Sequence, residues 1–191
     1  MFNRLFGRKR EPVDPYDLKP HWPPHWPLAI HLPPGGEFER RKPPHYLNWC
    51  MHRDMAGPGG FYNIEGGYGP FPYPPPDGPL HPVLLPFMLM DMFPEGARHL
   101  HVGVMLPAGN HEWTVVQSIL PSDGVRGDEP VRLFACITGI EGERPMFVNL
   151  LFMHYYPAAP DILERLKAML GGADGEWKMQ PWPVNQTETS D

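Results

Sequence analysis

Cysteine and serine are scarce in this chain of 191 residues, and each scarcity argues against a class of protein. The two cysteines, Cys50 and Cys136, are too few and too far apart for a small secreted domain held together by disulfides. We therefore expect two reduced thiols in a cytoplasmic protein. The serines are Ser118, Ser122 and Ser190, and none lies in the Gly-x-Ser-x-Gly turn of serine hydrolases. Nucleophilic catalysis therefore has little support.

A long apolar run is also missing. The longest candidate, 83–92, is shorter than a membrane span of about 20 residues and contains Pro86 and Asp91. Residues 1–10 hold four basic residues and lack the apolar centre of a signal peptide. They fit one amphipathic turn, which we expect to be an N-terminal tag. A single turn binds lipid weakly, so the sequence argues against a membrane surface as partner.

The charge balance is acidic once residues 1–10 are set aside. The whole chain has 16 Lys and Arg against 22 Asp and Glu, a net charge of −6. Four of the basic residues lie in 1–10, so the remainder has 12 basic and 22 acidic residues, a net charge of −10. Nucleic-acid binding requires a basic surface. We therefore expect no nucleic acid as partner.

Proline, by contrast, is abundant and unevenly distributed. Of 28 prolines, 20 lie in residues 1–94. Each proline fixes its φ angle and removes a backbone donor, so a proline-rich segment makes few helix or sheet hydrogen bonds. We predict an irregular Pro/Gly-rich arm over 11–82. This arm needs a protein surface to lie on, either that of its own domain or that of a neighbour.

Aromatic side chains interleaved with these prolines form the candidate partner-binding set. Large rigid rings dominate protein–protein contacts, which favours a role in binding. The members of the set are Trp22, Trp26, Trp49, Phe61, Tyr62, Phe71 and Tyr73. The alternative is that these rings only cover their own domain. The segment 21–27 repeats His-Trp-Pro at a spacing of four, so a polyproline helix with three residues per turn does not align its two Trp rings.

The pattern beyond this arm indicates an α+β domain over 83–184. Apolar segments joined by short turns predict an antiparallel meander of four to five strands. The expected strands span 83–92, 99–106, 113–120, 131–140 and 145–156. Pro160, Asp161 and an apolar stripe from Ile162 to Leu170 predict one packed C-terminal helix that ends at Gly171. We expect 185–191 to be a polar tail.

His99 and His101 form the sharpest candidate for a metal site. Residues i and i+2 of a strand point to the same face, so both imidazoles are expected on one side of the sheet. A third ligand such as His111 or Glu112 would complete a site for a divalent transition metal. The alternative is two polar residues on the wetter face of a half-buried strand.

Three functions are consistent with these patterns. The leading hypothesis is a non-catalytic protein-interaction or assembly subunit whose aromatic arm docks on a protein partner or on its own oligomer. A proline-restricted chain loses less conformational freedom when it docks. The first alternative is a small metal-dependent enzyme built on the His-x-His pair. The second is an acidic immunity or inhibitor protein that binds a toxin or an enzyme.

Overall fold

The computed structural model describes residues 17–39, 46–51, 60–70, 89–106, 111–121, 130–140, 146–155, 160–172 and 174–183. These residues contain ten strands and one helix. In chain order the elements are β1 (Lys19–His21), β2 (Ile30–Leu32), β3 (Glu37–Phe38), β4 (Tyr46–Cys50), β5 (Asn63–Pro70), β6 (Arg98–Leu106), β7 (Trp113–Leu120), β8 (Val131–Ile140), β9 (Met146–Tyr155), α3 (Ile162–Met169) and β10 (Glu176–Pro181). The predicted tag 1–10 and tail 185–191 lie outside the described residues.

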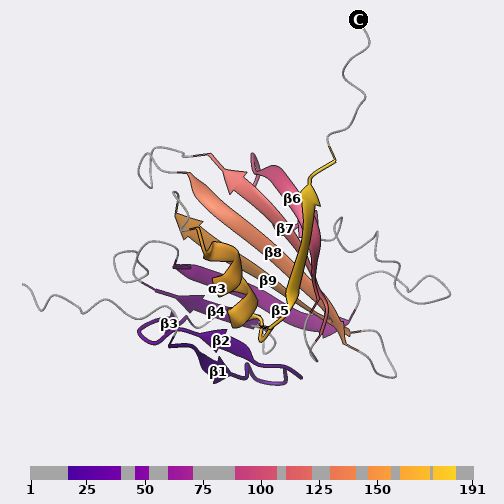
Figure 1. The fold of residues 1–191 in the computed structure, drawn as a ribbon. Coiled ribbons are helices and arrows are strands. Elements are labelled where there is room, and N and C mark those ends of the chain that lie inside the picture. The colour runs from indigo at the N-terminus through magenta and orange to yellow at the C-terminus, as the bar shows by residue number, and fades with distance from the viewer. Residues whose placement is uncertain are drawn as a thin grey trace, which may run out of the picture.

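Eight of the strands form one antiparallel sheet, in the order β10-β6-β7-β8-β9-β5-β4-β3 (Figure 1). Strands β6 to β9 are consecutive neighbours, so the predicted meander is present. The class α+β and the antiparallel sheet are confirmed. The predicted strand count of four to five is wrong, because the arm supplies β3, β4 and β5 and the chain after the helix supplies β10.

Proline density explains why the arm strands were not predicted. The average proline content of residues 11–82 argues against a sheet. However, β4 contains no proline, and the only proline of β5 is Pro70, its last residue. Both strands can therefore donate every backbone hydrogen bond except the last one of β5.

The strand predicted over 83–92 is also wrong in its described part. Leu89 and Met90 lie in a helical turn, and the amide of Met92 donates to the carbonyl of Leu89 at 3.1 Å; residues 83–88 are not described.

The cross-strand register assigns each residue to one of two faces of the sheet. One row of partners reads Trp49, Ile64, Phe152, Phe134, Gln117 and His101. A neighbouring row on the opposite face reads Asn48, Glu65, Leu151, Ala135, Val116 and Val102. The aromatic residues of the first row share one core cluster with α3, so we call this side the helix face and the other side the far face.

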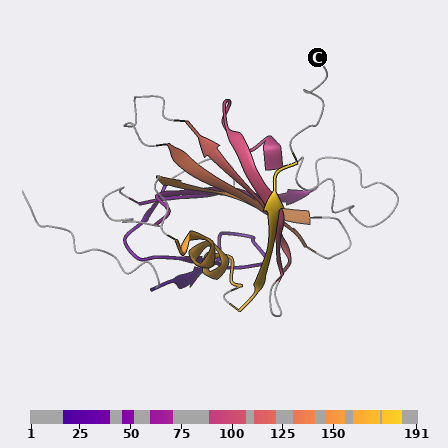
Figure 2. The ribbon, with the colours of Figure 1, turned by 45° about the horizontal axis from the view of Figure 1, so that its top comes forward.

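Two elements cover the helix face. Helix α3 buries Ile162, Leu166 and Met169 against it, as the apolar stripe predicts. Gly171 follows with a φ of 78°, a left-handed angle that glycine adopts at helix ends. The hairpin of β1 and β2 lies beside α3 over the same side of the curved sheet (Figure 2). It adds Ile30 and Leu32 to the core. None of the described helices is long and apolar enough to cross a bilayer.

Candidate binding site

A pocket of about 410 Å³ opens on the far face, where β4, β5 and β9 lie side by side. We call it the Asn48 pocket. Among the described residues, its lining is formed by Tyr46, Leu47, Asn48, Glu65, Gly66, Met92, Asn149 and Leu151. The volume lies within the range of about 300–1,000 Å³ found for small-molecule and cofactor sites. Polar groups from three strands converge here over an apolar floor, an arrangement typical of such sites.

The carboxamide of Asn48 is the least satisfied group in this lining. Asn48 is only 5% exposed, and its Nδ2 donates to Oε2 of Glu39 at 2.7 Å. Because the carboxylate accepts only a donor, this bond fixes which end of the amide is nitrogen. The opposite end, Oδ1, is buried, and no described residue donates a hydrogen bond to it. Leaving such an acceptor unpaired costs about 1–3 kcal/mol, so a ligand that donates to it would recover that energy.

A second amide repeats this arrangement one step along the same face. Nδ2 of Asn63 donates to Oε1 of Glu65 at 3.1 Å, and Oδ1 of Asn63 is buried with no hydrogen bond from the part of the chain that the structure describes. The side chain of Glu65 stands between the two amides, because Glu65 pairs with Asn48 across the strands and lies two residues from Asn63. Carboxylate and amide oxygens thus concentrate at this point of the far face.

Cys50 is the thiol nearest to these carboxylates, and it stays protonated. Burial raises its pKa first, followed by its hydrogen bond to Glu39 and by the charges of Glu39 and Glu37. Its Sγ lies 3.6 Å from Oε1 of Glu39 and 3.6 Å from the carbonyl of Glu37. Both cysteines are free, and Cys136 is buried in the helix-face core, where burial raises its pKa strongly. Neither thiol has the lowered pKa of a catalytic nucleophile.

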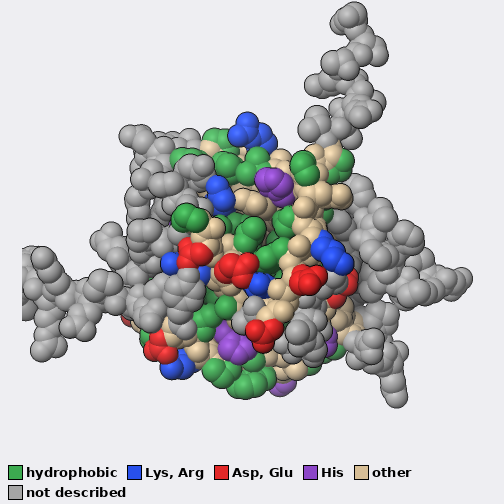
Figure 3. Space-filling model, in the orientation of Figure 1, with side chains coloured by type: hydrophobic (Ala, Val, Ile, Leu, Met, Phe, Trp, Pro, Cys, Tyr) green, Lys and Arg blue, Asp and Glu red, His purple; other side chains and the backbone are tan. Residues whose placement is uncertain are grey.

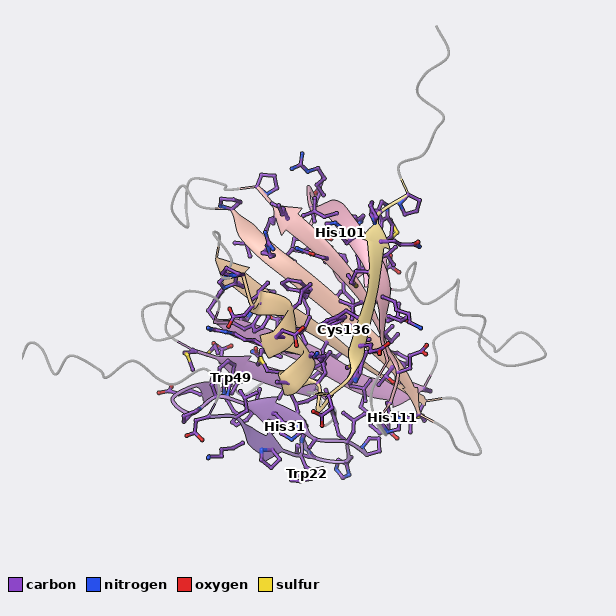
Figure 4. The ribbon with its side chains drawn as sticks, in the orientation of Figure 1. Trp22, His31, Trp49, His101, His111 and Cys136 are labelled. Atoms are coloured by element: carbon purple, nitrogen blue, oxygen red, sulfur yellow. The ribbon has the colours of Figure 1, made fainter. Side chains whose placement is uncertain are left out.

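The candidate partner-binding residues divide between core and surface. Trp26, Trp49 and Phe61 are buried in the helix-face core, so they hold this chain together. Tyr62 is half-buried. Trp22 is 61% exposed, and Figure 4 places it at the lower rim of the molecule. Phe71 and Tyr73 lie outside the described residues.

A turn explains why the two halves of the His-Trp-Pro repeat differ. The amide of Trp26 donates to the carbonyl of Pro23 at 3.0 Å, and His25 has a φ of 69°. These features define a tight turn with Pro24 and His25 at its centre. The turn reverses the chain between the two indoles, so Trp26 packs into the core while Trp22 stays in solvent. The repeat therefore does not form a continuous polyproline helix.

His99 and His101 do not share a face. His99 pairs with Ser118 and His101 with Gln117, and a β-bulge lies between the two histidines. Ser118 and Gln117 are neighbours in β7 and point to opposite faces, so the bulge turns His99 to the far face and leaves His101 on the helix face. His111 precedes β7 at the other end of the sheet from His101 (Figure 4). The same-face geometry expected from the His-x-His spacing is therefore wrong, and the described residues contain no group of metal ligands.

His99 instead belongs to an aromatic cluster on the far face. Its ring lies between Phe93 and Trp182, with ring centroids 5.0 and 4.8 Å away. Its Nδ1 makes a 2.7 Å hydrogen bond with Oγ of Ser118. Burial lowers the pKa of His99. Although Ser and His in contact resemble a catalytic pair, Ser118 is fully buried, so this contact is structural.

No family model matches the chain, and no curated protein matches it. The site therefore has to be interpreted from its own geometry.

Sequence patterns alone did not identify the residues of the Asn48 pocket. The available signal was alternation of polar and apolar residues in 46–50 and 63–65, the period of a half-buried strand. High proline and glycine density around both segments argued for loops and concealed this signal. Asn149 lies in a predicted strand, but the sequence does not show that β5 is its neighbour.

Proposed function

We propose that this chain is a non-catalytic, cytoplasmic protein-interaction subunit that docks on a protein partner. The docking surface is an aromatic edge formed by Trp22 and Phe38, which the ring of His21 connects by stacking on Phe38. Tyr46 is a further exposed ring, on the far face of β4. This proposal keeps the leading hypothesis from the sequence. It leaves out Trp26, Trp49 and Phe61, because these three predicted contact residues are buried in the core. Phe71 and Tyr73 stay predictions.

The observation that carries the proposal is the exposure of two aromatic rings, Trp22 and Phe38, beside the contact that joins β1 to β3. Four large apolar side chains are exposed among the described residues, and the three aromatic ones are Trp22 at 61%, Phe38 at 51% and Tyr46 at 58%. The ring of His21 stacks on Phe38 with centroids 4.3 Å apart, which ties the end of β1 to β3. Hydrophobic side chains gather at the lower rim in Figure 3, where β1 and β2 lie. Tryptophan and tyrosine are enriched in the residues that dominate protein interfaces.

The local backbone supports docking at a low entropic cost. Trp22 lies directly between the last residue of β1 and the turn that begins at Pro23. The pyrrolidine rings of Pro23 and Pro24 restrict the chain beside it. A ring held in place before binding loses less conformational freedom on association. Trp22 is therefore suited to be the central anchor of the edge.

Variants that separate surface from core test this proposal. We expect Trp22→Ala and Phe38→Ser to weaken partner binding by about thirtyfold, a typical effect of removing a dominant interface residue, with little change in thermal stability. Trp49→Ala is the matched control, because loss of a buried ring costs about 3–5 kcal/mol of stability. The measurement is the native mass of the full chain, purified and in cell extract, with the melting temperature of each variant.

Two results would contradict the proposal. A wild-type chain that keeps the monomer mass of 21.8 kDa in extract has no partner. A complex that survives both surface substitutions docks elsewhere. A mass that is a multiple of the monomer in the purified sample identifies a second copy of this chain as the partner. Binding of a toxin or enzyme with loss of its activity would identify the chain as an inhibitor.

A further inference from the structure

We propose that the Asn48 pocket binds a small molecule through a neutral carboxamide group. The lining presents one oriented hydrogen-bond donor and one oriented acceptor, and a carboxamide offers the complement of both. Neither Trp22 nor Phe38 lines the pocket, so this site is separate from the docking surface proposed above. The inference therefore goes beyond the docking function and does not depend on it.

Asn149 supplies the donor. The backbone amide of Gly67 donates to Oδ1 of Asn149 at 2.7 Å. Because a backbone N–H can only donate, this bond fixes which end of the Asn149 carboxamide is nitrogen. Asn149 is half-buried, and no hydrogen bond to a described residue uses its Nδ2. The two N–H groups of this nitrogen can therefore bind a carbonyl oxygen in the pocket.

Asn48 supplies the acceptor. Its Nδ2 donates to Glu39, whose backbone amide in turn donates to the carbonyl of Asn48, so the nitrogen end is held beside β3. Oδ1 is therefore turned toward β5, where the pocket opens. The Asn48 side chain is 5% exposed, and no described residue donates to Oδ1. A ligand N–H would recover the free energy that a buried acceptor loses when its hydrogen bond is not made.

A neutral amide matches these two groups better than a charged ligand does. A carboxylate offers only acceptors, so it would leave Oδ1 of Asn48 without a donor. An ammonium offers only donors, so it would leave Nδ2 of Asn149 without an acceptor. Glu65 also lines the pocket, but it already accepts a hydrogen bond from Asn63 at 3.1 Å. Recognition of a carboxamide requires no bond to Glu65.

The size and the apolar part of the lining favour an organic ligand over bound water. The volume of about 410 Å³ is far larger than the roughly 30 Å³ of one water molecule. Leu151 belongs to the far-face core and Met92 packs against that core, so both give the pocket an apolar surface. The ring of Tyr46 stands at the position of Gly67, where a Cβ would lie 3.6 Å from it. A planar apolar body can pack between these side chains while its carboxamide bonds the two asparagines.

Titration of the full-length chain with benzamide, followed by NMR, tests the inference. Acetophenone is the matched ligand, because it keeps the ring and the carbonyl group but has no N–H for Asn48. Benzoate is the second, because it has only acceptor oxygens and carries a charge. We expect each of these ligands to bind about fivefold more weakly than benzamide, which corresponds to the loss of one hydrogen bond.

Two variants assign the effect to the two asparagines. Asn149→Asp keeps an oxygen for the Gly67 amide and replaces the donor Nδ2 by an acceptor, so we expect benzamide binding to fall about tenfold. Gln180→Glu makes the same amide-to-acid change at an exposed position of β10, at the other edge of the sheet, and should have no effect. In Asn48→Ala, the preference for benzamide over acetophenone should fall to within about twofold.

The comparison of ligands on the wild-type chain needs no substitution, so it decides the question even if a variant does not fold. Equal binding of benzamide and acetophenone, tighter binding of benzoate, or no saturable binding would overturn the inference. Binding of N-acetyl-glutamine methylamide that is tighter than that of benzamide and is lost in Asn149→Asp would overturn the small-molecule assignment, in favour of a glutamine side chain.

The two proposals fail independently. Loss of the complex in Trp22→Ala and Phe38→Ser with no binding of benzamide would remove only the carboxamide site. Binding of benzamide that depends on Asn149, in a chain that stays monomeric in extract, would remove only the docking function.

Discussion

His99 and His101 lie on opposite faces of one sheet, although a single residue separates them in the chain. The bulge between them shifts the register by one residue against β7 and so reverses the face on which His99 projects. The bulge directs the imidazole of His99 to Ser118, Phe93 and Trp182 on the far face. His101 stays on the helix face, where its Nδ1 is buried and makes no hydrogen bond with the described residues. A two-residue spacing therefore does not make these histidines a pair.

This relationship predicts that His99 and His101 do not hold a metal together. We expect His99→Ala and His101→Ala to leave the metal content of the purified protein, and its affinity for added zinc, within twofold of the wild-type values. Elemental analysis by mass spectrometry and a zinc titration provide the measurement. A stoichiometric metal that is lost from both single variants would restore the metal-enzyme hypothesis and with it the role proposed for His111.

The same histidine predicts a loss of stability in mild acid. Burial lowers the pKa of His99 below 6.5 in the folded state, so the folded protein binds this proton less readily than the unfolded chain. The neutral ring therefore contributes stability above pH 6.5, and the contribution is lost as pH falls through the lower folded-state pKa. At pH 7.5 we expect His99→Gln to cost about 1 kcal/mol through its hydrogen bond to Ser118, and less at pH 5.

Urea unfolding at several pH values between 5 and 7.5 measures this difference. His21 also has a pKa lowered by burial, and it contributes equally to the wild type and to the His99 variant. His111→Gln, at an exposed position, is the control and should follow the wild-type curve. A destabilisation by His99→Gln that is constant across this range would contradict the predicted linkage.

Replacement of two glycines in the sheet by alanine is predicted to change stability by different amounts. A Cβ on Gly103 would lie 2.1 Å from the carbonyl oxygen of Lys178 and 2.6 Å from the Cα of Met179, both in the backbone of β10. Gly103→Ala therefore has to push β10 away from β6, and we expect a loss of about 1–3 kcal/mol. A Cβ on Gly139 would meet nothing within 4 Å, so Gly139→Ala should stay within about 0.5 kcal/mol of wild type.

Thermal or chemical unfolding of both glycine variants checks this prediction. Hydrogen exchange adds a local measurement, because increased exchange in β10 of Gly103→Ala would locate the damage at the β6–β10 pair. Equal stability of the two variants would show that β10 does not pack against Gly103 as the register indicates.

Much of the fold could be predicted from local patterns. The bounds predicted for β7 and β8 coincide with those observed, and the stripe from Ile162 to Leu170 predicted the helix. Alternation and capping depend on residues close together in the chain, so a single sequence carries them. The arm strands could not be predicted in the same way. Their pairing depends on partners such as β9, which lies more than 70 residues away.

Local sequence patterns could not predict the candidate site for the same reason. Asn48, Glu65 and Asn149 become neighbours only when β4, β5 and β9 pair. The different surroundings of Trp22 and Trp26 are decided by a turn and by the core that receives one indole and not the other. Composition identified aromatic rings as the contact-making residues, and it did not distinguish those that hold the domain from those left in solvent.

The sequence by itself determined an acidic α+β protein with an antiparallel meander and one helix, because apolar periodicity and charge are properties of the chain. The tertiary structure decided which face each side chain occupies and which rings remain exposed. It also placed an unpaired amide oxygen beside a carboxylate in one pocket. These outcomes depend on register, a bulge and contacts between distant segments, and a one-residue change in any register reverses the faces on which side chains project.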